Sequence, residues 1–213
     1  MNSDLSRFLE ILRDEDRFEA LRFIIDLKES KGLSVMEIFE ILTYSLNNMQ
    51  QNEDENIDIW KEHVRTAIIK TIVENLYPFV IEERNTVNTP RKKTVAVICP
   101  PEEYHDLGAR MVSDILTING YKSIFVGGNT PLRVYEAGLE HEKIDYVAIS
   151  ISNPYHLFSA RRITESLRKT FPAVKIIIGG SAISKLGDEL ETLKADFISN
   201  SLDDLSNLEG AIL

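Results

Sequence analysis

The fold is decided by one stretch near the middle of the chain, TVAVICPPEEYHDLG (residues 94–108). It opens with a short β-branched run, continues through a loop with two prolines and two acids, and ends where helical periodicity begins. A strand that leads through a polar loop into a helix is the first half of a β-α unit. The stretch therefore predicts the start of an α/β domain.

The same alternation of strand and helix patterns continues to the end of the chain. Strands are predicted at Thr94–Cys99, Ser123–Val126, Tyr146–Ile151, Lys175–Ile178 and Phe197–Ser199, with helices at about 107–119, 131–141, 156–170 and 182–193. Repeated β-α units pack as a parallel sheet with helices on both faces. We therefore expect a doubly wound, flavodoxin-like sheet of five strands over residues 94–213.

The sequence before this domain shows helical periodicity instead. Residues 1–84 repeat apolar side chains at spacings of three and four, and Ser34 followed by Glu37 has the pattern of a capping box. Four helices on short connections predict a small bundle. Residues 85–93 are polar and contain Pro90, which is typical of a linker between two domains.

The last predicted helix of the bundle begins near Ile57. Trp60, the only tryptophan, falls on its apolar side, so we expect it to pack in the core. Pro78 is expected to bend or end this helix, because a proline removes a backbone donor and clashes with the preceding turn.

Composition excludes several functional classes. The 34 acidic and 24 basic side chains give a formal charge of -10, which repels a phosphate backbone and argues against direct nucleic-acid binding. No run approaches the ~20 apolar residues of a membrane helix. Cys99 is the only cysteine, and the first residues lack the pattern of a secretion signal. We expect a cytoplasmic protein without a membrane span.

Chemistry is expected at the carboxyl ends of the strands, where parallel sheets bind ligands. His105 follows the first strand and can offer one ring nitrogen to a metal, while Glu103 can accept a hydrogen bond from the other. Gly108 opens the next helix and would let a bulky planar ligand approach the backbone. On these residues alone, an exposed loop histidine beside a turn glycine is an equal alternative.

Two other strand ends point to the same edge of the sheet. Ser150 and Ser152 end the third strand, and Gly179 and Gly180 end the fourth. Each pair alone is an ordinary turn former. Together with His105 they frame one crevice, so we expect these residues to bind a common ligand.

This combination resembles the cobalamin-binding domain, the vitamin B12-binding family with the pattern Asp-x-His-x-x-Gly, then Ser-x-Leu or Ser-x-Thr, then Gly-Gly. The resemblance covers about residues 93–213, and the preceding helices resemble the bundle that caps the cofactor in that family. It implies a base-off, His-on cobalamin with His105 as the lower axial ligand of cobalt. It also implies that Ser150 bonds the benzimidazole of the nucleotide tail, and that Gly179 and Gly180 leave space for that tail.

The chain departs from the family pattern at three positions. Glu103 replaces the usual Asp, and its extra methylene leaves open whether the hydrogen bond to His105 is kept. Ser152 stands where Leu or Thr is more usual. Asn52 stands where light-responsive regulators place a Trp, which argues against adenosyl capping and light response.

Within the family, the stretch from Tyr104 to Pro131 is similar to cobalamin-sensing regulators. Glu62 and His63 match the Glu-His pair that such regulators place over the upper face of the cofactor, although the residues alone favour a solvated helix face. The preferred interpretation is a cobalamin sensor, not an enzyme, that acts on a partner regulator or through homo-oligomerisation. A corrinoid methyl carrier for a partner methyltransferase is the alternative, and an apo interaction module with a degenerate site is the third hypothesis.

Other α/β families fit the strand ends less well. A response-regulator receiver needs a phosphoacceptor Asp where Ser150 stands and a Lys after a later strand. The first strand is not followed by a Gly-x-Gly-x-x-Gly, a P-loop or a flavodoxin-type phosphate loop. His141 and His156 are expected on the surface, and neither is given a role.

Overall fold

The computed structural model describes residues 3–48, 54–87 and 91–208. The chain divides into two compact units, Met1–Glu83 and Arg84–Leu213, and each has its own core. Asn52, singled out in the sequence, lies outside the described residues.

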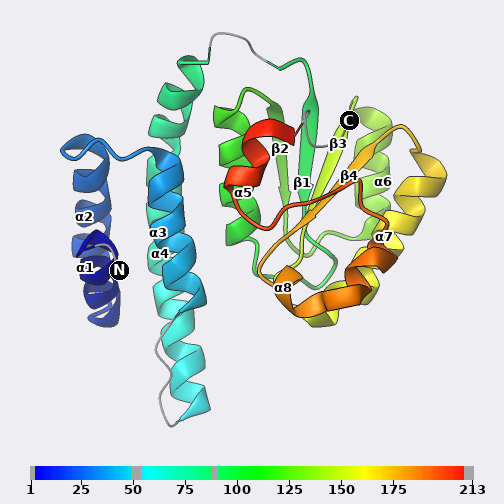
Figure 1. The fold of residues 1–213 in the computed structure, drawn as a ribbon. Helices are drawn as coiled ribbons and strands as arrows, with labels where there is room; N and C mark the ends of the chain where they lie inside the picture. Colours follow the sequence, from blue (N-terminus) through cyan, green and yellow to red (C-terminus); the bar gives the residue numbers. More distant parts are fainter. Residues whose placement is uncertain (1–2, 49–53, 88–90, 209–213) are drawn as a thin grey trace. The chain divides into compact units, whose positions relative to one another are not determined.

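Four helices precede the first strand, as predicted (Figure 1). They are α1 (Ser3–Arg13), α2 (Arg17–Glu29), α3 (Val35–Asn47) and α4 (Glu55–Asn85). The capping box is confirmed, because Ser34 and Glu37 each accept a hydrogen bond from the other's backbone N–H at the start of α3. The core of this unit is apolar, with side chains such as Phe8, Phe39 and Ile69 fully buried.

Helix α4 differs from the prediction at Trp60 and at Pro78. Trp60 is 68% exposed, so its expected place in the core is wrong. The buried stripe of α4 starts at Arg65, and five residues at 3.6 per turn rotate Trp60 away from that stripe. Pro78 lies inside the helix, which continues to Asn85. Pro78 is expected to bend or end the helix; the end is wrong, because a proline costs one backbone hydrogen bond while packing of neighbours such as Leu76 holds the helix, and the bend stays a prediction.

The second unit is built on a fully parallel sheet. Its strands are β1 (Thr94–Ile98), β2 (Lys122–Gly127), β3 (Tyr146–Ser150), β4 (Lys175–Gly179) and β5 (Phe197–Ile198). Their order is β2-β1-β3-β4-β5, which is that of a flavodoxin-like sheet. The predicted α/β fold class is confirmed.

Helices cover the two faces of this sheet, with α5 on one side and α6 and α7 on the other (Figure 1). They are α5 (Leu107–Ile118), α6 (Leu132–His141), α7 (Leu157–Thr170) and the short α8 (Ile183–Leu186). The single helix expected over 182–193 is instead α8 followed by a 3-10 helix, Gly187–Leu193. Gly187 has φ of 49°, a left-handed conformation that ends the α-helical run.

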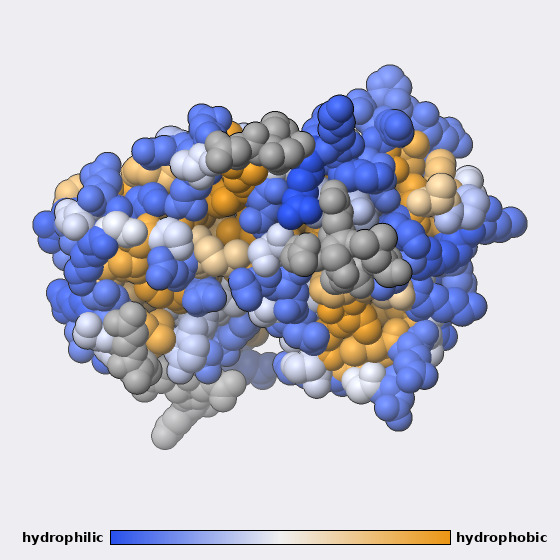
Figure 2. Space-filling model, turned by 45° about the horizontal axis from the view of Figure 1, so that its top comes forward, coloured by the Kyte–Doolittle hydropathy of each residue, from blue (hydrophilic) through white to orange (hydrophobic). Residues whose placement is uncertain are grey.

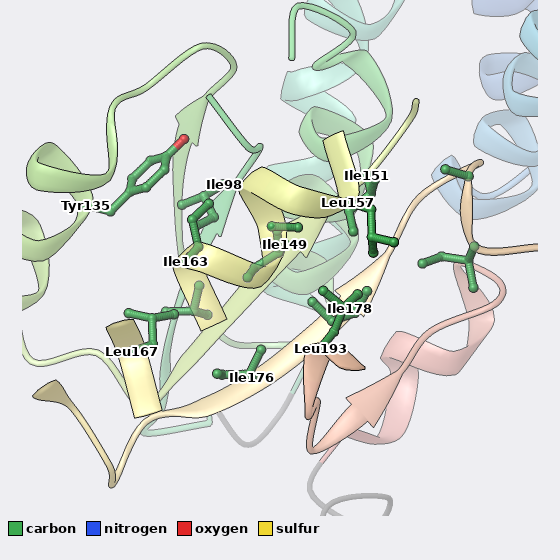
Figure 3. Packing of buried hydrophobic residues seen from close by; sticks show 14 of the residues in the cluster. Ile98, Tyr135, Ile149, Ile151, Leu157, Ile163, Leu167, Ile176, Ile178 and Leu193 are labelled. Carbon is green, nitrogen blue, oxygen red and sulfur yellow. The ribbon is translucent and has the colours of Figure 1, made fainter. Parts of the chain in front are cut away.

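The core of the second unit lies between the central strands and α7. Figure 3 shows strand side chains such as Ile98, Ile149 and Ile178 facing those of α7 and of the 3-10 helix that ends at Leu193. All five residues of β3 are buried, as expected for a strand covered on both faces. Tyr135 of α6 reaches this core, and its hydroxyl donates a hydrogen bond to the carbonyl oxygen of Cys99 just after β1.

Hydrophilic residues cover much of the molecular face that Figure 2 draws, with patches of hydrophobic surface between them. Within the described ranges, no helix combines the length and the apolar character needed to cross a bilayer.

Two aspartates close the sheet at the amino ends of its strands. Asp145 accepts a hydrogen bond from the N–H of Thr94 at 2.9 Å, and Asp196 accepts one from the N–H of Ile176 at 2.7 Å. Arg168 adds a bond to Asp196 at 2.6 Å. Burial alone would raise the pKa of Asp196, but the bonds from Ile176 and Arg168 outweigh it and hold the pKa below its usual value.

We predict that Asp196→Asn lowers the free energy of unfolding by about 1 kcal/mol at neutral pH. The lowered pKa stabilises the folded state above the ordinary value of 3.8, and this contribution is lost as the pH falls through the folded-state pKa. The difference from wild type in urea unfolding should therefore shrink in acid. Asp188→Asn, at an exposed carboxylate, is the control and should change little. If Asp196→Asn lowered the free energy of unfolding by the same amount at every pH, the prediction would be contradicted.

Candidate cofactor-binding site

The candidate site lies at the point where the winding of the sheet reverses. β1 is flanked by β2 on one side and by β3 on the other, so the segments that follow β1 and β3 diverge at the carboxyl edge. In open α/β sheets, ligands bind in the crevice at such a point. His105 follows β1, and Ser152 follows β3.

Glu103 joins the two segments. Its side chain is fully buried, and its two oxygens face different partners. Oε1 accepts hydrogen bonds from the backbone N–H and from the ring Nδ1 of His105, both at 2.9 Å. Oε2 accepts from the backbone N–H groups of Ser152 and Asn153 at 3.2 Å and from Nδ1 of His156 at 2.9 Å. One carboxylate thus accepts from five donors, which come from the segments after β1 and after β3.

The environment of Glu103 favours its ionised form. Burial alone would raise the pKa of Glu103, because it removes the water that stabilises a charge. The backbone bond from His105, the ring bonds from His156 and His105, and the charge of His156 outweigh burial and hold the pKa below its ordinary value. An ionised carboxylate can only accept hydrogen bonds, so both rings carry a proton on Nδ1.

His105 lies at the carboxyl edge of the sheet, with 60% of its side chain exposed. Because Nδ1 donates to Glu103, Nε2 is the nitrogen with which this ring would coordinate a metal. The extra methylene of Glu103 does not break this contact, since the hydrogen bond is kept at 2.9 Å.

The two serines after β3 have different surroundings. Ser152 donates from Oγ to the carbonyl oxygen of His105 at 3.1 Å, so it helps to hold the loop that carries the imidazole. Ser150 is buried and pairs in register with Gly179 of β4. Its hydroxyl makes no hydrogen bond within the part of the chain that the structure describes. Ser150 is therefore the serine with bonding capacity left for a ligand.

The three glycines predicted for the site also differ. A Cβ at Gly180, where φ is 109°, would lie 2.3 Å from the carbonyl oxygen of Ile151. Gly180 is therefore required by the fold itself. A Cβ at Gly179 would lie 3.4 Å from the carbonyl oxygen of Ser199, which is a close contact. Of these three glycines, only Gly108 would have no atom within 4 Å of an added Cβ.

The loop after β2 contacts the backbone of Glu102 and Glu103. The N–H of Asn129 donates to the carbonyl oxygen of Glu103 at 2.8 Å, and Oδ1 of Asn129 accepts from the N–H of Glu102 at 3.2 Å. At Gly128 a Cβ would lie 2.6 Å from the carbonyl oxygen of Glu103. The backbone around Glu103 is thus fixed by a segment that the sequence analysis did not connect with it.

The structure brings Glu103, His105 and Ser152 together by direct contacts, but not every predicted site residue. Glu62 and His63 are exposed on α4 in the first unit, as a solvated helix face would be. Their expected contact with the cofactor stays a prediction.

His156 is the site residue that sequence analysis missed. Its expected place on the surface is wrong, because its side chain is only 17% exposed and its Nδ1 bonds Glu103. A signal was available in the sequence. Asn153 before Pro154 caps the 3-10 turn Pro154–His156, which places position 156 at the start of α7 and beside the crevice.

A family model described as the B12 binding domain matches residues 93–200, about half of the chain. The chain belongs to the B12-binding domain family. Its cofactor is cobalamin, so the resemblance and the cofactor predicted from the sequence are confirmed.

Solved structures with this B12-binding fold match nearly the whole chain, including the helices before the sheet. The monomethylamine corrinoid protein of Methanosarcina barkeri has a TM-score of 0.80 at 14% identity, over 97% of each chain. A cobalamin-binding protein of Desulfitobacterium hafniense DCB-2 gives 0.52 at 15% identity, over 98% of each chain. The methanol:cobalamin methyltransferase complex MtaBC of Methanosarcina barkeri gives 0.50 at 14% identity, over 99% of this chain and 80% of that one. At such identities the similarity shows a shared fold.

We predict that Gly180→Ala destabilises the B12-binding unit by about 3 kcal/mol, from a strained φ and a clash with the backbone of Ile151. Thermal unfolding of the cofactor-free protein measures this effect. Gly138→Ala is the matched control, because Gly138 lies inside α6 with nothing within 4 Å of a new Cβ. That variant should gain about 0.5–1 kcal/mol from helix propensity. Equal stability of the two variants would show that the contact at Gly180 does not constrain the fold.

Proposed function

We propose that this protein is a corrinoid carrier, which holds cobalamin through His105 and presents it to a partner methyltransferase. The observation that carries the proposal is the hydrogen bond between the buried Glu103 and Nδ1 of His105 at the switch point of the sheet. It occurs in a B12-binding chain whose fold matches a monomethylamine corrinoid protein over 97% of both chains. The MtaBC complex, which is a methanol:cobalamin methyltransferase, supports a partner of that class.

Cobalamin, when bound, would supply the cobalt chemistry that accepts and donates a methyl group. His105 would offer Nε2 to the cobalt, in an orientation that Glu103 fixes through Nδ1. An ionised carboxylate behind an imidazole raises the basicity of the opposite nitrogen. The buried Glu103 therefore makes His105 a stronger and better oriented ligand than a free histidine.

Two further residues fit the nucleotide tail of the cofactor. The buried hydroxyl of Ser150 has no hydrogen bond within the described chain, so it can bond the benzimidazole of the tail. Gly108 has open space where a side chain would stand, which suits a close approach of the ligand to the start of α5. Both assignments are proposals that follow from the fit of these residues.

A cobalamin sensor is the second candidate. The similarity of the stretch Tyr104–Pro131 to regulators and the exposed pair Glu62 and His63 favour it. Because the formal charge of -10 argues against direct binding to nucleic acid, a sensor would act on a partner protein or through its own oligomerisation. We prefer the carrier because the fold matches a corrinoid protein from end to end. An apo module with a degenerate site is less favoured, because the bond between Glu103 and His105 is intact.

We predict that His105→Ala removes the axial nitrogen from cobalt and weakens cobalamin binding about tenfold or more. Electron paramagnetic resonance of the Co(II) form detects this nitrogen by its hyperfine splitting. In protein labelled with ¹⁵N-histidine the splitting should change from a triplet to a doublet, which separates a histidine from the benzimidazole of the cofactor itself.

The control for this experiment is His141→Ala, since His141 is exposed at the end of α6. It should keep both the affinity and the doublet. A labelled wild-type protein that still gives a triplet would mean that a nitrogen other than histidine coordinates cobalt, and the proposed role of His105 would be lost.

A carrier and a sensor differ in what happens after cofactor binding. We predict that protein loaded with methylcobalamin transfers its methyl group to a thiol when a cobalamin:thiol methyltransferase is added, at least tenfold faster than the His105→Ala variant at equal cofactor loading. Mass spectrometry of the methylated thiol measures the rate. An equal rate for loaded wild type and His105→Ala, or a change of oligomeric state with the upper ligand in the absence of transfer, would favour the sensor.

A further inference from the structure

We propose that the exposed side of α7, with the turn before it, is the docking surface for an acidic face of the partner methyltransferase. Its members are two aromatic residues, Tyr155 and Phe158, and two basic residues, Arg162 and Lys169. These four residues form the α7 surface. The proposal deepens the proposed function and rests on it for the identity of the partner.

The two aromatic rings of the α7 surface are left in water by the fold. Tyr155 is 91% exposed and Phe158 is 68% exposed. A single exposed ring is common on a protein surface. These two are three positions apart across the turn that leads into α7, a spacing that places side chains side by side. Neighbouring aromatic rings in water indicate a surface that another molecule covers.

The turn that carries Tyr155 is joined to the candidate cofactor site. Oδ1 of Asn153 accepts a hydrogen bond from the N–H of Tyr155 at 3.0 Å, and the N–H of Asn153 donates to Glu103 at 3.2 Å. Another exposed ring, Tyr104, directly precedes His105. Methyl transfer requires the partner to approach this edge of the sheet. The exposed rings therefore lie where that contact must occur.

Helix α7 continues the surface as a row of charged side chains. Phe158, Arg162, Glu165 and Lys169 are exposed at spacings of four, three and four, which keeps them on one face of the helix. Within the described residues, the side chains of Arg162 and Lys169 form no hydrogen bond or ion pair. Their charges are therefore available to a partner.

The charge of α7 is opposite to that of the whole chain. The helix has four basic side chains and one acidic side chain, a formal charge of +3, whereas the chain has a formal charge of -10. Arg168 is bound to Asp196 at 2.6 Å and points to the sheet. The exposed cations favour an acidic surface on the partner, because complementary charges steer two proteins together and fix their orientation.

Basic and aromatic side chains also form binding surfaces for single-stranded nucleic acid. The formal charge of -10 opposes that interpretation, because it repels phosphate groups. Tyrosine, phenylalanine and arginine are enriched at the centres of protein interfaces, where a few such side chains provide most of the binding energy. An acidic protein partner is therefore favoured.

The test measures binding of a cobalamin:thiol methyltransferase to the protein loaded with methylcobalamin, by surface plasmon resonance without thiol. Arg162→Glu with Lys169→Glu, the α7 charge variant, should slow association at least tenfold at about 0.05 M salt. The difference should nearly vanish at about 0.5 M salt, because salt screens exposed charges. Tyr155→Ser with Phe158→Ser should speed dissociation about tenfold at both salt concentrations, because buried rings hold an interface together.

The matched control is Lys92→Glu with Lys143→Glu. Both lysines are exposed, and they precede β1 and β3 at the edge of the sheet opposite to the site. The control changes the net charge by the same amount as the α7 charge variant, and its association rate should stay within about twofold of wild type. Equal slowing of the two variants would show that net charge alone governs association and would overturn the proposal.

Cobalamin affinity separates docking from cofactor binding. Every variant should bind cobalamin as wild type does. Loss of cobalamin by the variant without the rings of Tyr155 and Phe158 would assign them to the cofactor and contradict the proposal. Binding of a single-stranded oligouridine that the α7 charge variant abolishes would contradict it as well.

The same assay separates this proposal from the proposed function. Absence of binding between wild type and the methyltransferase would overturn the docking surface. If wild type binds the enzyme but transfers no methyl group once thiol is added, the proposed function fails. The association and dissociation rates of the variants would still decide whether α7 is the docking surface.

Discussion

The site depends on one buried negative charge, the carboxylate of Glu103. A carboxylate cannot be taken out of water without compensation, and here five N–H groups provide it. The donors come from two segments about 50 residues apart, as the bond to Ser152 spans 49 residues and the bond to His156 spans 53. The charge therefore ties the ends of β1 and β3 together and orients an imidazole in the same step.

The sheet makes this arrangement feasible. Because β1 and β3 are neighbours in the order β2-β1-β3-β4-β5, the segments that follow them leave the same edge, and the side chain of Glu103 reaches from one to the other. The aspartates Asp145 and Asp196 perform a related task at the opposite edge, where each binds a backbone N–H at the start of a neighbouring strand. Acidic side chains that accept backbone hydrogen bonds thus close the sheet at both ends.

The sequence predicted what depends on local pattern. Five strands, four preceding helices, the capping box at Ser34 and the pairing of Glu103 with His105 all follow from spacing along a short stretch of chain. The misses depend on tertiary structure or on helical phase. The turn at Asn153 and Pro154 indicates where His156 lies, but its contact with Glu103 spans 53 residues and does not follow from that turn alone. Trp60 falls on the apolar side predicted from helical periodicity but outside the stripe of α4 that is buried, so the predicted phase of the helix was wrong at this position.

The close approach of Gly180 to the backbone of Ile151 has a consequence for how such sequences are interpreted. The residue is demanded by the shape of the sheet edge whether or not a corrin is ever bound. A descendant that had abandoned vitamin B12 would be unable to replace it without rebuilding that edge. The second glycine of the Gly-Gly signature thus indicates the fold and not a working cofactor site. A carboxylate in contact with an imidazole is the more informative sign of such a site.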